Sequence, residues 1–94
     1  MITLKLSFYS LLIKEFGQEI YLDVDPPINF FELFNLFSSI SGQLASSILL
    51  EKNYTLKENY IILLNGQNID GFKGLKTIIE DASEVDFFHK VGGG

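Results

Sequence analysis

Apolar residues change their spacing once in the first half of this chain, and this change most narrows the folds that the chain can adopt. Every second residue from Ile2 to Phe8 is apolar, and the same alternation returns over residues 20–24. A period of two is typical of a strand that buries one face. After Pro26-Pro27 the apolar residues recur at spacings of three and four, which is typical of a helix with one buried stripe. Two strands followed by one helix favour an α+β fold.

The helix is predicted over residues 29–40, between two recognisable ends. Asn29 stands at the N-cap, and Glu32 three residues later completes a capping box. Gly42 is a typical C-terminal stop. The apolar stripe consists of Phe30, Leu33, Phe34, Phe37 and Ile40. Because such a stripe needs a sheet to cover it, we expect a mixed sheet packed on one main helix.

The remaining segments complete this sheet. Residues 60–64 form a short apolar strand, and Asn65-Gly66 after it is the strongest short hairpin signal. In the last strand, Val85 and Phe87 share one face, and Phe88 lies on the other. Other assignments are a turn or short helical piece over 9–16 ended by Gly17, a second helical piece over 43–50, a loop over 51–59, a returning strand over 67–69 and one helical turn over 75–79.

Composition excludes several classes of function. The chain has no cysteine, so it forms no disulfide framework, zinc site or thiol nucleophile from its own residues. Its net charge is −5, and its seven lysines form no cluster in the sequence, which disfavours nucleic-acid binding. The N-terminus shows no signal-peptide pattern, and apolar runs are too short to span a membrane. We therefore expect a soluble cytoplasmic protein that binds neither nucleic acid nor membrane.

The C-terminal end is the most unusual segment. It reads Val91-Gly92-Gly93-Gly94, and glycine this dense neither packs a core nor forms a stable element. We expect one domain over residues 1–90 and a flexible glycine tail over 91–94. Measured from His89, the extended end spans roughly 20 Å, enough to enter the active site of another protein.

The ordered set of motifs from Tyr60 onward resembles the MoaD/ThiS family of ubiquitin-like sulfur carriers, most closely the MoaD type. The matching features are the apolar strand and Asn65-Gly66, the pair Gly74-Leu75, an acidic turn before Glu84-Val85, the aromatic strand end, and Val91 leading into Gly93-Gly94. The two early strands and the helix follow the order of the same family. The resemblance implies a β-grasp (ubiquitin-like) fold.

The resemblance also implies a carrier cycle centred on Gly94. An E1-like adenylyltransferase, MoaB/ThiF-like in type, would use ATP and magnesium to adenylate the Gly94 carboxylate, which then becomes a thiocarboxylate. Val91, Gly92, Gly93 and Gly94 would enter the tunnel of a partner. For a MoaD-type protein the second partner is the large subunit of molybdopterin synthase, and this chain is the small subunit and a co-substrate. The chain itself would bind no cofactor and no metal, and would not be an enzyme.

Several alternatives remain open at this point. The same carrier chemistry serves thiamin thiazole formation, tRNA thiolation or conjugation to protein lysines. A ubiquitin-like binding module with a passive tail is a different class of function. Phe88 is either a core residue or part of a surface that contacts a partner. His89, the only histidine, is expected to be an exposed residue of the tail, because it has no nucleophile or second metal ligand nearby in the sequence.

Overall fold

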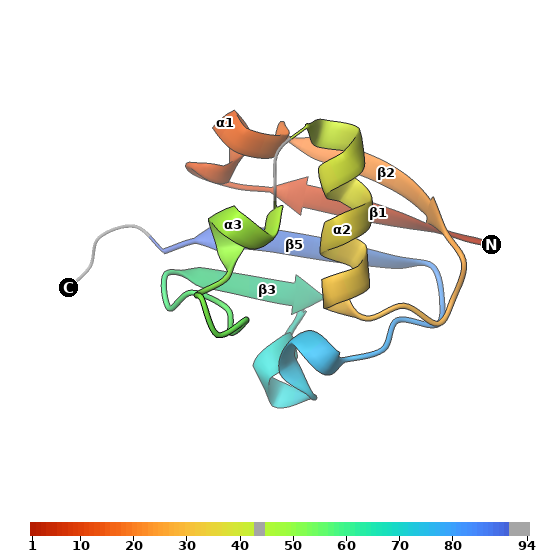
Figure 1. Ribbon diagram of the computed structural model, residues 1–94. Coiled ribbons are helices and arrows are strands. Elements are labelled where there is room, and N and C mark those ends of the chain that lie inside the picture. Colours follow the sequence, from red (N-terminus) through yellow and green to blue (C-terminus); the bar gives the residue numbers. More distant parts are fainter. Residues whose placement is uncertain (43–44, 91–94) are drawn as a thin grey trace.

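The computed structural model describes residues 1–42 and 45–90 of the chain. Five strands form one sheet in the order β2-β1-β5-β3-β4, and helices pack against one of its faces (Figure 1). The elements are β1 (Ile2–Phe8), α1 (Leu12–Phe16), β2 (Glu19–Val24), α2 (Phe30–Ser41), α3 (Ala45–Leu49), β3 (Tyr60–Leu64), β4 (Gln67–Asn68), the 3-10 turns η1 (Ile69–Gly71) and η2 (Gly74–Lys76), and β5 (Ser83–His89).

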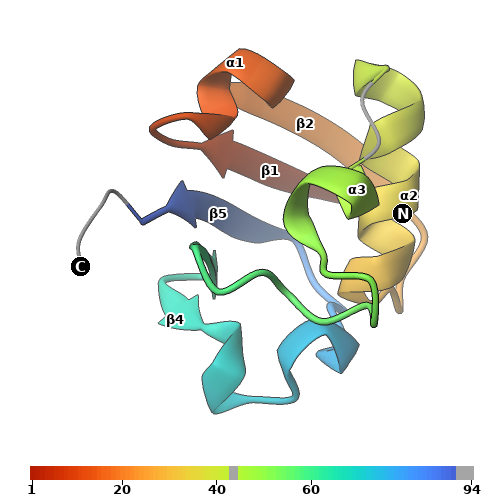
Figure 2. The same ribbon diagram turned by 60° about the vertical axis from the view of Figure 1, so that its left-hand side comes forward.

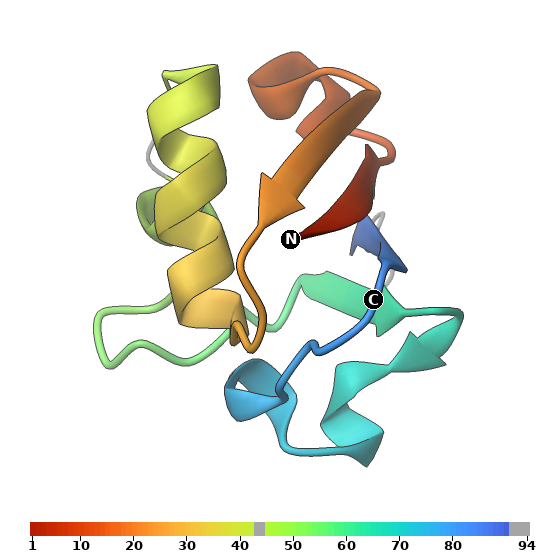
Figure 3. The same cartoon turned by 90° about the vertical axis from the view of Figure 1, so that its right-hand side faces the viewer.

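The first and last strands lie side by side in the middle of the sheet. β1 pairs with β2 in antiparallel and with β5 in parallel orientation, whereas β5 pairs with β3 in antiparallel orientation. The sheet is therefore mixed, as predicted. Seen from the side, α2 stands against one face of the sheet (Figure 3). This arrangement is the β-grasp fold that the sequence led us to expect.

The main helix begins and ends where its capping residues predict. Asn29 Oδ1 accepts a hydrogen bond of 2.9 Å from the Glu32 amide, and the Asn29 amide donates to Glu32 Oε1 at 3.1 Å. These two bonds satisfy amide groups that have no partner within the helix. At the other end Gly42 adopts a left-handed conformation with φ of 78°. A residue without a Cβ reaches this conformation at little cost.

The core is formed by the stripe of α2 and the inner face of the sheet. Phe30, Leu33, Phe34 and Phe37 are fully buried, as predicted. Ile40 was assigned to the same stripe, and this assignment is wrong, because its side chain is 60% exposed. At 3.6 residues per turn Ile40 falls about 70° to the side of the stripe's centre. It therefore faces solvent rather than the sheet.

The segment after β3 departs from the sequence prediction in two places. Asn65 and Gly66 have φ of 50° and 83°. The predicted hairpin turn, which needs positive φ at both residues, is therefore confirmed. The returning strand, however, ends at Asn68, because Asn68 Oδ1 accepts a hydrogen bond from the Asp70 amide and caps η1 instead. The helical turn predicted over 75–79 is the shorter η2, since Ile79 leaves it to pair with Ile28.

The edge of the sheet beyond β3 is therefore built from short pieces. β4, η1 and η2 lie beside β3 in a compact group (Figure 2). α3 and the loop 51–59 pass over the helical side, where Leu49 and Leu50 are buried. No helix in the described parts of the chain has the length and apolar character needed to span a membrane.

Candidate functional site

The strand that leads to the C-terminal tail, β5, is a central strand of the sheet. β5 has a strand neighbour on each side, with five residue pairs to β1 and five to β3. Both ladders reach its C-terminal half: Phe87 lies opposite Phe8 of β1 and opposite Ile62 of β3. The chain therefore leaves the sheet from a rigid central position rather than from a frayed edge.

Regular pairing extends further toward the tail than predicted. His89 lies opposite Tyr60, with ring centroids 5.1 Å apart, and the Lys90 amide donates a hydrogen bond of 2.7 Å to the Asn59 carbonyl oxygen. His89 is half-buried, so its assignment as an exposed tail residue is wrong. The alternation of β5 explains this, because His89 shares a face with Val85 and Phe87.

The Nδ1 atom of His89 is buried and has no hydrogen-bond partner among the described residues. The folded domain includes His89, which pairs with Tyr60, and Lys90, whose amide is hydrogen-bonded to Asn59. Beyond Lys90 the chain has four residues, which reach at most about 13–14 Å when extended. This is shorter than the reach of roughly 20 Å estimated from His89.

The residues predicted to carry the chemistry lie outside the described residues. They are Val91, Gly92, Gly93 and Gly94. Their roles therefore stay predictions, as does the boundary between a domain over 1–90 and a tail over 91–94. The structure describes the strand β5 and its neighbours β1 and β3, which precede these residues.

Phe88 lies on the face of the sheet opposite the helices. Its ring stacks on the ring of Tyr9, with centroids 4.4 Å apart and planes 8° from parallel. Tyr9 Oη donates a hydrogen bond of 3.3 Å to Asp86 Oδ1, which orients the phenol along the same face. Phe88 is half-buried and does not belong to the main core, whereas its neighbour Phe87 does.

Two further apolar residues join Phe88 on this open face. In the ladder between β3 and β5, Ile61 lies opposite Phe88 and Leu63 lies opposite Asp86. We call Tyr9, Ile61, Leu63 and Phe88 the outer patch. Ile61 and Leu63 were not singled out from the sequence, although a signal exists: five apolar residues in a row, from Tyr60 to Leu64, place apolar side chains on both faces of a strand.

The rest of the open face carries charged and polar side chains together with the exposed Tyr21. Lys5 Nζ lies 3.7 Å from Glu19 Oε1, and Glu19, followed by Tyr21 and Glu84, raises the pKa of Lys5 above its ordinary value. Across the same strand pair, β1 and β2, Thr3 Oγ1 donates to Asp23 Oδ1 at 2.7 Å. The outer patch is therefore bordered by polar and acidic side chains. Apolar area with a polar rim is typical of a protein-contact surface.

The described residues contain little that resembles a catalytic centre. Among residues 1–42 and 45–90, no group of three or more His, Cys, Asp or Glu side chains converges in a way that could hold a metal ion. The pKa of Tyr60 is raised, first by burial and then by the negative charge of Glu15. Tyr60 packs against His89 on the helical side of the sheet, so it contributes to the packing beneath the tail.

Comparison with known proteins agrees with this architecture. The model of the ThiS family matches residues 17–94. No curated protein matches the chain. Among solved structures, the small archaeal modifier protein 1 of Methanosarcina acetivorans is 24% identical, with coverage of 100% of this chain and 98% of that chain and a TM-score of 0.75.

Two other solved structures have the same fold at lower identity. A chain of the BexX/CysO complex of Amycolatopsis orientalis is 18% identical over 97% of this chain and 99% of that chain, with a TM-score of 0.75. A Pyrococcus furiosus protein provisionally assigned as subunit 1 of molybdopterin converting factor is 11% identical over 97% and 100%, with a TM-score of 0.69. At these identities the structures establish the β-grasp fold.

Proposed function

Because this chain belongs to the ThiS family of ubiquitin-like sulfur carriers, we propose that it carries sulfur as a thiocarboxylate on Gly94. Members of this family are small carrier proteins rather than catalysts. One observation supports the proposal most: β5, which has paired neighbours on both sides as far as Phe87 and on the β3 side as far as His89, leads directly into the glycine tail. A rigid body with a short flexible end can hold its position on an enzyme while the end reaches the reacting group.

The chemistry suits a terminal glycine. A carboxylate is a poor electrophile until one of its oxygens becomes part of a good leaving group. In the proposed cycle the Gly94 carboxylate attacks the α-phosphorus of ATP on an E1-like enzyme, and pyrophosphate leaves. Hydrosulfide supplied by a donor then attacks the acyl carbon, AMP leaves with the electrons of the broken C–O bond, and loss of the S–H proton leaves the thiocarboxylate. Glycine has no Cβ that would hinder either attack.

The tail residues would act by fitting the partner rather than by supplying side chains. Val91, Gly92, Gly93 and Gly94 have little bulk and would thread a narrow tunnel. Only four residues extend beyond the hydrogen bond between Lys90 and Asn59. The docked body must therefore approach within about 13–14 Å of the reacting phosphorus. This short reach makes the surface around the end of β5 part of the recognition.

The outer patch is the surface that we assign to this recognition. Phe88 and Tyr9 lie next to the point where β5 ends, and Ile61 and Leu63 extend the apolar area across β3. An apolar patch that is already ordered contributes affinity without a cost of ordering. We propose that the E1-like adenylyltransferase and the enzyme that receives the sulfur both contact it. ATP and magnesium belong to the activating enzyme.

For the sulfur acceptor we propose molybdopterin synthesis, in which this chain would be the small subunit of a synthase and the large subunit its partner. The P. furiosus protein assigned to molybdopterin converting factor supports this choice. The modifier protein of M. acetivorans, with higher identity, favours conjugation to proteins as a second candidate. Thiamin thiazole formation and tRNA thiolation share the same first step. In each of these pathways we place the protein in the cytoplasm.

The deciding experiment is ATP–pyrophosphate exchange with the cognate activating enzyme, comparing the full chain with a variant that lacks Gly94. The deletion draws the terminal carboxylate back by about 3.3–3.6 Å, so exchange should be lost. The melting temperature should not change, because a glycine tail has no side chains to add to the core. Electrospray mass spectrometry should show AMP or sulfur on the full chain alone.

Equal exchange rates for the two proteins would contradict the carrier function. A ubiquitin-like module with a passive tail would then explain the fold better. A matched control is Gly71→Ala, a glycine outside the tail where an added Cβ meets no atom within 4 Å. This variant should exchange at the rate of the unmodified chain.

A further inference from the structure

The fold gathers lysines that are scattered in the sequence. A groove of roughly 530 Å³ runs between the loop that precedes β3 and the short elements β4, η1 and η2. Its lining includes the four lysines Lys57, Lys73, Lys76 and Lys90. These lysines form no cluster in the sequence, yet the fold places all four around one groove. We call this site the lysine groove.

The charge of the lysine groove is opposite to that of the rest of the protein. Its lining has four lysines and two carboxylates, Glu58 and Asp70, so it is net positive. The remainder of the chain has three lysines and ten carboxylates. At physiological salt the screening length is about 8 Å, so a ligand inside the groove experiences mainly the nearby lysines. The lysine groove is therefore a local anion-attracting site on an acidic protein.

Most of these positive charges are not neutralised by the protein itself. The one ion pair within residues 1–42 and 45–90 joins Lys5 of β1 to Glu19 of β2, and neither residue lines the groove. In the lysine groove, Lys57 Nζ donates to the Ser47 carbonyl oxygen at 3.3 Å, whereas Lys73, Lys76 and Lys90 are exposed. Their ammonium groups can therefore meet carboxylates of another molecule without breaking an existing ion pair in the described parts of the chain.

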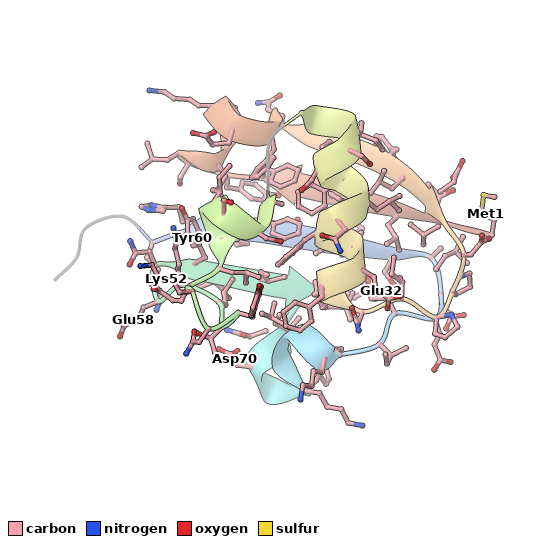
Figure 4. The ribbon with its side chains drawn as sticks, in the orientation of Figure 1. Met1, Glu32, Lys52, Glu58, Tyr60 and Asp70 are labelled. Carbon is pink, nitrogen blue, oxygen red and sulfur yellow. The ribbon has the colours of Figure 1, made fainter. Side chains whose placement is uncertain are left out.

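The floor of the lysine groove is apolar and lies along a sheet edge. Phe31 and Leu75 line it beside Tyr60 and Ile61. The ladder between β3 and β4 includes only Leu63 and Leu64, so from Tyr60 to Ile62 β3 has no strand neighbour on this side among the described residues. Figure 4 places Tyr60 and Glu58 at the beginning of β3 and Asp70 in η1.

From this combination we infer that the lysine groove binds an extended acidic segment of a partner protein. Carboxylates of the segment would pair with Lys73, Lys76 and Lys90, and one apolar side chain would rest on Phe31 and Leu75. A small anion would use neither the apolar floor nor the open sheet edge, and lysines spread over several elements do not converge on a single point. Binding here involves no group of the tail, so it is independent of the chemistry proposed for Gly94.

The inference can be tested by titrating the ¹⁵N-labelled full chain with a capped ten-residue peptide of Asp and Glu with one central Phe. Shift changes should centre on the groove lysines and Tyr60. A Lys73→Gln/Lys76→Gln variant should bind roughly two- to thirtyfold more weakly, as the loss of two exposed ion pairs implies. The matched control is Lys5→Gln/Lys14→Gln, which has the same net charge and should bind within about twofold of the unmodified chain.

Other ligands distinguish the alternatives. A peptide with Asn and Gln in place of the acids should bind much more weakly. Inorganic phosphate or oligouridine should not displace the acidic peptide when it is added at the same concentration of negative charge. Three results would overturn the inference. The neutral peptide would bind as tightly as the acidic one, phosphate or oligouridine would displace the acidic peptide, or the two lysine variants would lose affinity for the acidic peptide equally. The variant without Gly94 should bind the acidic peptide unchanged, so a failure here is separate from a failure of the carrier function.

Discussion

The ring of Phe88 lies parallel to the ring of Tyr9, with centroids 4.4 Å apart. Phe88 is the second-last residue of β5, and Tyr9 directly follows β1, where its amide donates to the Phe87 carbonyl oxygen at 3.1 Å. The stack and this hydrogen bond join the two central strands at the end of the sheet from which the tail departs. The C-terminal end of β5 is therefore stabilised by contacts between residues near the two ends of the sequence.

This stack should be measurable as a coupling between the two residues. In a double-mutant cycle of Tyr9→Ala and Phe88→Ala, we expect a coupling of about 0.5–1.5 kcal/mol in the free energy of unfolding, as for other stacked rings. Urea unfolding of the four proteins provides the measurement. The control partner is Tyr21, which is exposed on β2. Its coupling to Phe88 should be zero to within about 0.5 kcal/mol. Equal coupling in both cycles would show that the stack contributes nothing specific.

Substitution within the tail should separate folding from activation. The double variant Gly93→Ala/Gly94→Ala adds two methyl groups where we propose a narrow tunnel. It should unfold at the same temperature as the unmodified chain, yet support ATP–pyrophosphate exchange poorly. Differential scanning calorimetry and the exchange assay test the two statements. Gly71→Ala serves again as the control, since its methyl lies outside the tail. Full exchange by the double variant would argue against a tight tunnel.

Within the core, Phe34 should be among the least replaceable residues. It is fully buried and packs against Phe30, Phe37 and Phe87. Phe34→Ala should therefore lower the free energy of unfolding by about 3–5 kcal/mol. Ile40 on the same helix faces solvent. Ile40→Ala should therefore change this free energy by less than about 0.5 kcal/mol. Chemical denaturation of both variants tests the stripe, and a comparable loss for Ile40→Ala would contradict the assigned helix face.

Tyr60 should make the fold sensitive to alkaline pH. Burial, with help from Glu15, raises its pKa above the ordinary value of 10.0. The folded state therefore holds this proton more tightly than the unfolded chain does. Its contribution to stability is fully present below pH 10 and is lost as pH rises through the higher folded pKa. Relative to Tyr60→Phe, the unmodified chain should therefore lose stability above pH 10.

The measurement is the free energy of unfolding of both proteins between pH 8 and pH 11. Every ionisable group other than Tyr60 is common to the two proteins, so its effect on stability cancels in the difference. A difference that stays constant across this range would show that the Tyr60 phenol is not protected from ionisation.

Interactions between residues close in sequence were readable from the sequence alone. The capping box of Asn29 and Glu32, the left-handed stop at Gly42 and the Asn65-Gly66 turn each depend on a few neighbouring residues, and the structure confirms them. The buried stripe of α2 was also predicted, because helical periodicity places Phe30, Leu33, Phe34 and Phe37 on one face whatever the helix packs against. The family followed from the order of the motifs along the chain, and the carrier chemistry that we propose for Gly94 rests on that family.

Features that depend on residues far apart in the sequence could be identified only from the tertiary structure. His89 was expected in the tail, but its pairing with Tyr60 keeps it in the sheet. The outer patch exists because β3 lies beside β5, and the lysine groove exists because β4 ends after two residues and the chain turns into η1 and η2. Periodicity identifies which face of a segment is apolar, whereas strand neighbours and grooves depend on which segments meet, and that is settled by packing the whole chain around one core.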